Sequence, residues 1–295
     1  MSTLHSDLLE AEVRYYDTGK YRTRAIEINN GKLPLILTHG GGGHAEAYAR
    51  NLRRLSEVAR PIAIDFIWHG LSSKPAYWSS DPSAEKHWLK QFTDQVLDLM
   101  DHLKIEKAVI EGESLGGWVA FDMGINHPDR TAGLVLNTAW GMRFDSGTVK
   151  ESALDLDLLR ETSVNALNNP TRETIRKRMQ WLMPLGGFTE ELIDIRIALW
   201  SRPDTRAALL DYYAHLFGPR NQEFLFTEND LTRVKPRTLI LWTDHNPIHG
   251  VDAAERMREL IPNSTVGLIK NAAHWPQWEQ PEEHDRLVSD FIRSL

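Results

Sequence analysis

The sequence predicts an α/β fold in which a mostly parallel sheet is covered by helices on both faces and interrupted by a helical insertion. Three observations support this class. Short apolar runs alternate with amphipathic segments up to about residue 139, the alternation stops over 140–228, and it resumes over 229–295. Such alternation is typical of parallel sheets, because the crossover helices cover both faces. We therefore expect a core formed by 1–139 and 229–295, with 140–228 as a helical cap.

The first part of the core begins with two strand-like runs at 13–16 and 23–28, joined by the turn-prone segment 17–19. Apolar residues at helical spacing predict a long helix over 83–103. The other expected strands of this part are 33–38, 61–65, 108–110 and 133–136, and its other expected helices are 45–55 and 115–126.

The insertion shows amphipathic helical periodicity and no convincing strand. Its expected helices are 154–167, 172–182, 190–200 and 205–216. The second part of the core is expected to consist of strand 238–242, helix 252–260, strand 265–269 and helix 282–292.

Composition limits the class of partner. The net charge of −7 argues against nucleic acid or an anionic membrane as the main partner, so a small-molecule substrate is expected. The chain has no cysteine, which excludes disulfides and thiol chemistry. No run approaches the ~20 apolar residues of a membrane span, and residues 1–10 do not resemble a signal peptide. We expect a cytoplasmic protein without metal or organic cofactor, and homo-oligomer formation is left open.

A nucleophile motif follows the strand expected at 108–110. Residues 112–117 read GESLGG and open the helix expected at 115–126, which is the context that a G-x-S-x-G elbow requires. A sharp strand-to-helix turn presents the hydroxyl of Ser114 above the sheet, and glycines two residues away on either side avoid a collision. The motif predicts the α/β-hydrolase fold, with Ser114 as nucleophile.

A glycine cluster, HGGGG at 39–43, ends the strand expected at 33–38. Four consecutive glycines suggest that the backbone, including Gly40, approaches the substrate closely. We expect the N–H groups of Gly41 and Leu115 to stabilise a developing oxyanion. His39 is expected to be a structural hydrogen-bonding residue.

The general base is expected on the loop after the last strand, because this fold orders its triad as serine, acid, histidine. His274 lies just after the strand at 265–269 and is the only one of 12 histidines that fits.

The acid is the least defined member of the triad. Asp244 is the only carboxylate on the turn after strand 238–242, whereas Asn246 occupies the slot where many relatives have aspartate. Three interpretations stay open: Asp244 reaches the histidine through a reshaped turn, Asn246 orients it as a neutral group, or the chain is an Asp-to-Asn variant. Asp244 is the first choice.

The chain resembles the carbon–carbon bond hydrolases that act on meta-cleavage products of aromatic ring degradation. The resemblance covers most of the length and rests on the glycine cluster, the serine elbow and three further segments: NPTRET at 169–174, TEEL at 189–192 with Arg196 beyond it, and HWPQWE at 274–279.

The resemblance implies a 2-hydroxy-6-oxo-hexadienoate substrate. Its carboxylate would be bound by Arg196 and its chain would pack on Trp275, whereas the arginines of 172–178 are expected to be solvated. After ketonisation of the dienol, Ser114 or a water activated by His274 would add to the distal ketone, and the carbon–carbon bond would break.

Glu113 departs from the family, which usually has asparagine before the nucleophile. A carboxylate here would raise the pKa of His274 or repel an anionic substrate, so Glu113 is expected to contact the substrate region. Two alternatives remain: a carboxylesterase or lactonase that does not need Arg196, and a non-catalytic binding protein on the same fold.

Overall fold

The computed structural model describes residues 3–149 and 156–295, and its centre is an eight-stranded sheet. The strand order is β1-β2-β4-β3-β5-β6-β9-β10. β1 pairs antiparallel with β2, and β2 with β4, while every other pair in the sheet is parallel. The strands are β1 (Glu12–Asp17), β2 (Arg22–Glu27), β3 (Pro34–Thr38), β4 (Arg60–Ile64), β5 (Ala108–Glu113), β6 (Thr131–Asn137), β9 (Thr238–Thr243) and β10 (Ser264–Ile269). Each of the eight strands expected from the sequence is present.

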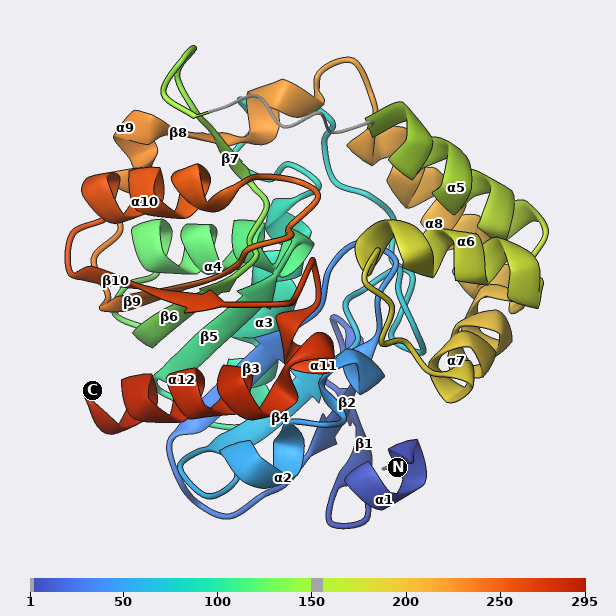
Figure 1. The fold of residues 1–295 in the computed structure, drawn as a ribbon, viewed down its shortest axis with the longest axis horizontal. Coiled ribbons are helices and arrows are strands. Elements are labelled where there is room, and N and C mark those ends of the chain that lie inside the picture. Colours follow the sequence, from blue (N-terminus) through green and yellow to red (C-terminus); the bar gives the residue numbers. More distant parts are fainter. Residues whose placement is uncertain (1–2, 150–155) are drawn as a thin grey trace.

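Helices cover both faces of the sheet (Figure 1). α3, α4 and α10 pack on one face, and α2 and α12 on the other, with α11 beside α12. These elements are α2 (Leu52–Leu55), α3 (Lys90–His102), α4 (Leu115–Asn126), α10 (Val251–Leu260), α11 (Pro276–Glu279) and α12 (Pro281–Arg293). The remaining short core helices are α1 (Leu4–Asp7), η1 (Ala45–Tyr48) and α9 (Glu228–Leu231).

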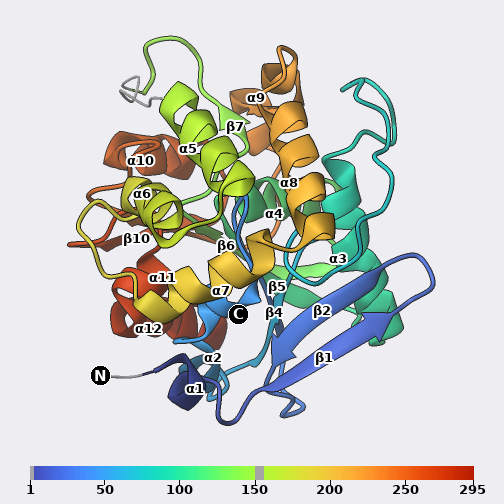
Figure 2. The same cartoon turned by 90° about the vertical axis from the view of Figure 1, so that its right-hand side faces the viewer.

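Four further helices lie together over one end of the sheet, as Figures 1 and 2 show from two sides. They are α5 (Leu156–Asn168), α6 (Arg172–Leu182), α7 (Glu190–Trp200) and α8 (Pro203–Leu216), followed by the short η2 (Asn221–Phe224). α5 packs on α6 and α8, and α7 on α6 and α8. The first residues of the helix expected at 154–167 lie outside the described part of the chain.

Three expectations about elements were wrong. The segment 45–55 forms two short helices, η1 and α2, in place of one. α3 begins at Lys90 and not at 83, because the preceding residues bridge back to Ser79, whose carbonyl accepts the N–H of Trp88. The segment 140–228 does contain strands: β7 (Met142–Arg143) pairs in parallel with β8 (Phe226–Thr227). Two residues per strand are too few to produce a recognisable pattern.

The parallel strands place their carboxyl ends at the edge of the sheet that faces α5–α8 (Figure 1). The glycine cluster follows β3, Ser114 follows β5, Asn246 follows β9 and His274 follows β10. Residues far apart in the sequence therefore meet at one edge. Among the described residues, no helix is long and apolar enough to cross a membrane.

Candidate active site

Ser114 sits at a sharp turn between β5 and α4. Its backbone has φ 50° and ψ −113°, a conformation that L-residues rarely adopt outside strained functional turns. A side chain at position 112 would collide with the backbone of Gly116, and one at 116 with Thr38. The glycines are therefore required by close packing, as the sequence predicts.

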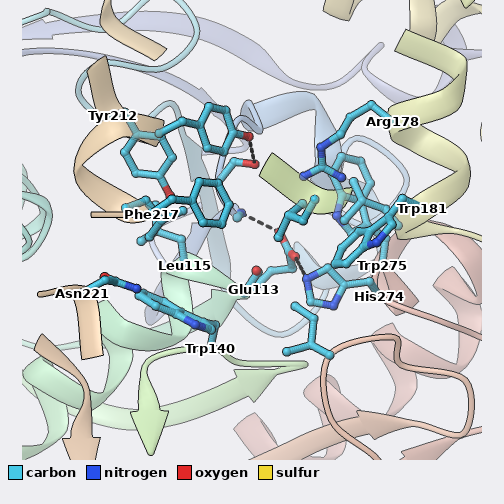
Figure 3. Close-up of a pocket in the computed structure, with 18 of the residues that line it drawn as sticks. Glu113, Leu115, Trp140, Arg178, Trp181, Tyr212, Phe217, Asn221, His274 and Trp275 are labelled. Atoms are coloured by element: carbon cyan, nitrogen blue, oxygen red, sulfur yellow. Dashed lines mark hydrogen bonds and ion pairs between the residues drawn. The ribbon is translucent and has the colours of Figure 1, made fainter. Parts of the chain in front are cut away.

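A cavity with about 770 Å³ of empty space lies above this turn, between the sheet edge and the α5–α8 helices. Ser114 and His274 both line it, as do the glycine cluster at Gly40 and Gly41 and the first residue of α4, Leu115. Aromatic side chains form much of the remaining wall: Trp140, Trp181, Tyr212, Tyr213, Phe217 and Trp275 (Figure 3 labels all but Tyr213). The structure thus brings the expected nucleophile, base and backbone donors to one cavity.

His274 is held by its neighbours on three sides. Its Nδ1 lies 3.0 Å from Oδ1 of Asn246, its carbonyl accepts the hydroxyl of Thr138 over 2.9 Å, and its N–H donates to the carbonyl of Leu182 in α6 over 3.2 Å. An amide oxygen can only accept, so Nδ1 carries the proton and Nε2 is left as a base. Burial, with the charge of Arg178 adding to it, lowers the pKa of His274 to about 3.

Asp244, the first choice for the acid, forms no hydrogen bond with His274 among the described residues. Its carboxylate lies 2.8 Å from Nδ1 of His245 and accepts the N–H groups of Asn271 and Ala272 over 3.1 and 3.4 Å. These contacts hold Asp244 against the loop that begins after β10. Asn246, two residues further along the turn, is the group that reaches His274.

Glu113 folds back onto the glycine cluster. Its Oε2 accepts the N–H of Gly40 over 2.5 Å, and its Oε1 lies 3.5 Å from Nε2 of His274 (Figure 3). Burial raises the pKa of this carboxyl to about 8, although Gly40, Arg196 and Arg178 act in the opposite direction. Glu113 and His274 therefore face each other as a neutral acid and a neutral base. Among the described residues, no hydrogen bond joins Ser114 Oγ to His274.

The glycine cluster is shaped by close contacts. A Cβ at position 40 would lie 2.7 Å from Cβ of Ser114, and one at position 41 would lie 2.7 Å from the hydroxyl of Tyr212. Because the N–H of Gly40 is bonded to Glu113, it is not free to bind a substrate as expected, although Gly40 lines the cavity. In the described part of the chain, the N–H groups of Gly41 and Leu115 have no protein acceptor.

His39 has the structural role that the sequence indicates. Its Nε2 accepts the N–H of Phe66 over 3.1 Å, and its Nδ1 lies 2.7 Å from the carbonyl oxygen of Gly40. Both ring nitrogens are therefore occupied. Burial lowers the pKa of His39 to about 4, so the ring is neutral.

Arg196 does not line the cavity. Its side chain is fully buried, with the guanidinium carbon 5.3 Å from the ring centres of both Trp200 and Trp275. All three of its nitrogens are buried without a hydrogen-bond partner. Burial, with the nearby charge of Arg178, lowers its pKa to about 10. Trp275, by contrast, lines the cavity as expected.

Arg178 was wrongly interpreted as a solvated arginine. It is only 3% exposed and lines the cavity, whereas Arg172 and Arg176 are exposed and pair with Glu190. The signal was present in the sequence: the buried residues of α6 are Ile175, Arg178, Met179 and Leu182, an i, i+3, i+4, i+7 pattern. An arginine at an apolar position of an amphipathic helix indicates a buried cation.

Comparison with known proteins agrees with this architecture. Residues 34–281 match the family described as the alpha/beta hydrolase fold. The chain is 26% identical over 290 residues to a 2-hydroxy-6-oxononadienedioate/2-hydroxy-6-oxononatrienedioate hydrolase of Pseudomonas putida, covering 97% of this chain and 93% of that protein. It is 25% identical over 279 residues to a 2-hydroxymuconate semialdehyde hydrolase of the same species, covering 92% and 91%.

A solved structure shares the fold. The 2-hydroxy-6-oxo-6-phenylhexa-2,4-dienoate hydrolase of Rhodococcus sp. strain RHA1 superposes with a TM-score of 0.80 at 19% identity, covering 96% of this chain and 99% of that one. The family match spans most of the chain, and the sheet order and elbow described above have the geometry that this family requires. The chain is therefore an enzyme that belongs to the α/β-hydrolase fold family.

Proposed function

We propose that this enzyme hydrolyses a carbon–carbon bond in a 2-hydroxy-6-oxo-dienoate, with Ser114 and His274 as its reactive pair. The observation that carries the proposal is the convergence of the strained Ser114, the neutral base His274 and two unbonded backbone donors on one cavity. The two Pseudomonas putida relatives, whose names state that they hydrolyse acids of this kind, support it.

The reaction begins with ketonisation of the dienol, which turns the carbon that will depart into a stabilised leaving group. His274 Nε2 takes a proton from Ser114, or from a water, as oxygen adds to the distal ketone. The N–H groups of Gly41 and Leu115 stabilise the resulting oxyanion, and one such donor is typically worth ~3 kcal/mol of barrier. When Ser114 attacks, cleavage releases the dienoic acid and leaves an acyl ester on Ser114, which one water hydrolyses to the carboxylic acid. When water attacks, cleavage releases both acids directly.

Residues 140–228 form the cap in this proposal, and the substrate lies between the cap and the sheet edge. The aromatic wall and the buried arginines suit a conjugated acid, because apolar walls bind the chain and guanidinium groups bind the carboxylate. We assign the 2-hydroxy-acid end to Arg196. Arg196 does not itself line the cavity, but its guanidinium carbon lies 5.3 Å from the centre of the Trp275 ring, which does.

The test compares two reaction classes on one preparation. The loss of dienoate absorbance gives kcat/KM for carbon–carbon cleavage, and mass spectrometry identifies the two acids that are released. Hydrolysis of p-nitrophenyl esters gives the esterase rate. We expect kcat/KM for the dienoate to exceed that for the esters by about 100-fold. The reverse order would support a carboxylesterase. Failure of an active-site phosphonate to label Ser114 would exclude both reactions with Ser114 as nucleophile.

A further inference from the structure

The part of the cavity wall formed by α6 carries a positive charge that no described carboxylate balances. Arg178 donates from Nε to the hydroxyl of Ser163 in α5 over 2.8 Å, while its Nη1 is buried without a partner. Figure 3 shows this side chain reaching from α6 into the space that His274 and Glu113 also face. One nitrogen is thus used for positioning, and the rest of the guanidinium fork is left for a ligand.

A second uncompensated cation lies nearby. The three nitrogens of Arg196 have no hydrogen-bond partner, and burial, with the charge of Arg178 adding to it, lowers the pKa of Arg196. Within residues 3–149 and 156–295, neither guanidinium forms an ion pair with a carboxylate. Glu113 contacts Gly40 and His274 and neither described guanidinium, and burial raises its pKa to about 8, so its carboxyl is mostly protonated near neutral pH.

Two buried guanidinium groups without an anionic partner are costly, since buried charge is normally paired and hydrogen-bonded. A ligand with one carboxylate would neutralise only one of the two positive charges. A ligand with carboxylates at both ends would balance both, and a planar guanidinium binds a carboxylate through two parallel hydrogen bonds.

We propose that the cavity is built for a dicarboxylate, with the unpaired face of Arg178 as the subsite for the second carboxylate. This inference rests on the proposed function, because it takes the first carboxylate to lie at Arg196. It adds a specificity-determining residue on α6 and narrows the substrate to an acid that is charged at both ends. The chain between the two ends lies along the aromatic wall, which includes Trp181 and Trp275.

The test measures binding with stable ligands, so it does not depend on turnover. Nonanedioate is compared with its monoamide by calorimetry, since the two differ in one charge and little in size. A second charge-assisted contact is worth about ten- to a hundredfold in Kd, so the wild-type protein should bind the diacid more tightly by that factor. Arg178→Gln should bind both ligands alike, whereas Arg178→Lys should keep part of the preference.

Two matched controls isolate the ligand contact. Ser163→Ala removes only the bond that positions Arg178, and Arg176→Gln removes an exposed arginine of the same helix. Arg176→Gln should keep the full preference for the diacid. Ser163→Ala should keep a weaker preference, because Arg178 is then less firmly positioned. Thermal unfolding of each variant shows whether the fold is intact. If Arg178→Gln does not fold, comparison of wild type with Arg178→Lys decides the question.

The outcomes separate this inference from the proposed function. Equal affinity of the wild-type protein for diacid and monoamide would overturn the second subsite, even if dienoates are cleaved. If Arg178→Gln lowers the affinity for the diacid and for the monoamide by the same factor, the second subsite would also be overturned. A diacid preference that depends on Arg178 would support the subsite, even in a protein that cleaves esters and no dienoate, and in that case only the carbon–carbon reaction would fail.

Discussion

The imidazole of His274 donates from Nδ1 to the side-chain oxygen of Asn246 over 3.0 Å, so a neutral amide holds the place that an acid occupies in many serine hydrolases. This bond selects the tautomer in which Nε2 is free to accept a proton. It does not supply the negative charge that would stabilise an imidazolium. His274 is therefore correctly oriented to accept a proton but is a weak base, with a lowered pKa.

Asn246→Asp should strengthen the base. The new carboxylate would raise the pKa of His274 and increase kcat by about tenfold, because it stabilises the imidazolium that forms as Ser114 is deprotonated. Asp244→Asn is the matched control and should leave kcat within about threefold, since Asp244 bonds to His245 and the loop amides. Steady-state kinetics on the dienoate measures both. A large loss in Asp244→Asn with no gain in Asn246→Asp would restore Asp244 as the acid.

The neutral state of Glu113 predicts an alkaline limit to activity. Its pKa of about 8 means that the carboxyl ionises as the pH rises through 8, which places a negative charge in the cavity proposed to bind an anionic substrate. The pKa of His274, about 3, keeps the base unprotonated well below neutral pH. We therefore expect kcat/KM to be flat from pH 5 to 7 and to fall above pH 8.

Glu113→Gln keeps the shape of the side chain and cannot ionise, so its pH–rate profile should lose the alkaline fall. Its amide can still accept the N–H of Gly40. An unchanged profile in this variant would assign the fall to another group.

Arg196→Gln should raise KM for the dienoate by about ten- to a hundredfold, because the variant loses a charge-assisted contact with the first carboxylate. Hydrolysis of a neutral p-nitrophenyl ester should change little. Arg202→Gln, an exposed arginine, is the control. If Arg196→Gln leaves KM and kcat for the dienoate at their wild-type values, Arg196 does not bind substrate.

A buried cluster of His284 and Asp285 in α12 with Glu111 in β5 predicts that the stability of the fold depends on pH. Nε2 of His284 lies 2.8 Å from Glu111, and Nδ1 lies 2.9 Å from Asp285. Burial disfavours protonation, but the two carboxylates outweigh it and raise the pKa of His284 to about 9. A raised folded-state pKa gives stability that is complete below pH 6.5 and is lost as the pH rises through 9.

His284→Gln should remove this contribution to the pH dependence and lower the free energy of unfolding by about 3 kcal/mol, because the buried Glu111 loses its cation, whereas Asp285 keeps its ion pair with Arg54. Urea unfolding at several pH values measures both effects. A variant that keeps the wild-type slope between pH 6.5 and 9 would contradict the assignment.

The sequence predicts the sheet and the reactive pair because both follow from local rules. Alternating apolar runs identify the eight strands, and the G-x-S-x-G turn identifies Ser114 by backbone geometry alone. The sequence leaves both Asp244 and Asn246 open as the orienting group, because they are two residues apart on one turn and only the path of that turn decides which side chain reaches His274. Arg178 was missed because its charge was given more weight than its apolar position on α6.

The long-range contacts of Glu113 could not be predicted either. The sequence shows a carboxylate beside the nucleophile, but its bond to Gly40 depends on how closely the turns after β3 and β5 approach each other. Burial then decides its protonation state, and with it the sign of its effect on an anionic substrate.

The central claim is that Ser114 cleaves a carbon–carbon bond. Rapid mixing of wild type and Ser114→Ala with a 2-hydroxy-6-oxo-dienoate, followed by the dienoate absorbance and by mass spectrometry of the products, tests it most directly. We expect cleavage into two acids by the wild-type enzyme and a fall in rate of at least about a thousandfold in Ser114→Ala. Undiminished cleavage by Ser114→Ala, or no cleavage of any such dienoate by the wild-type enzyme, would contradict it.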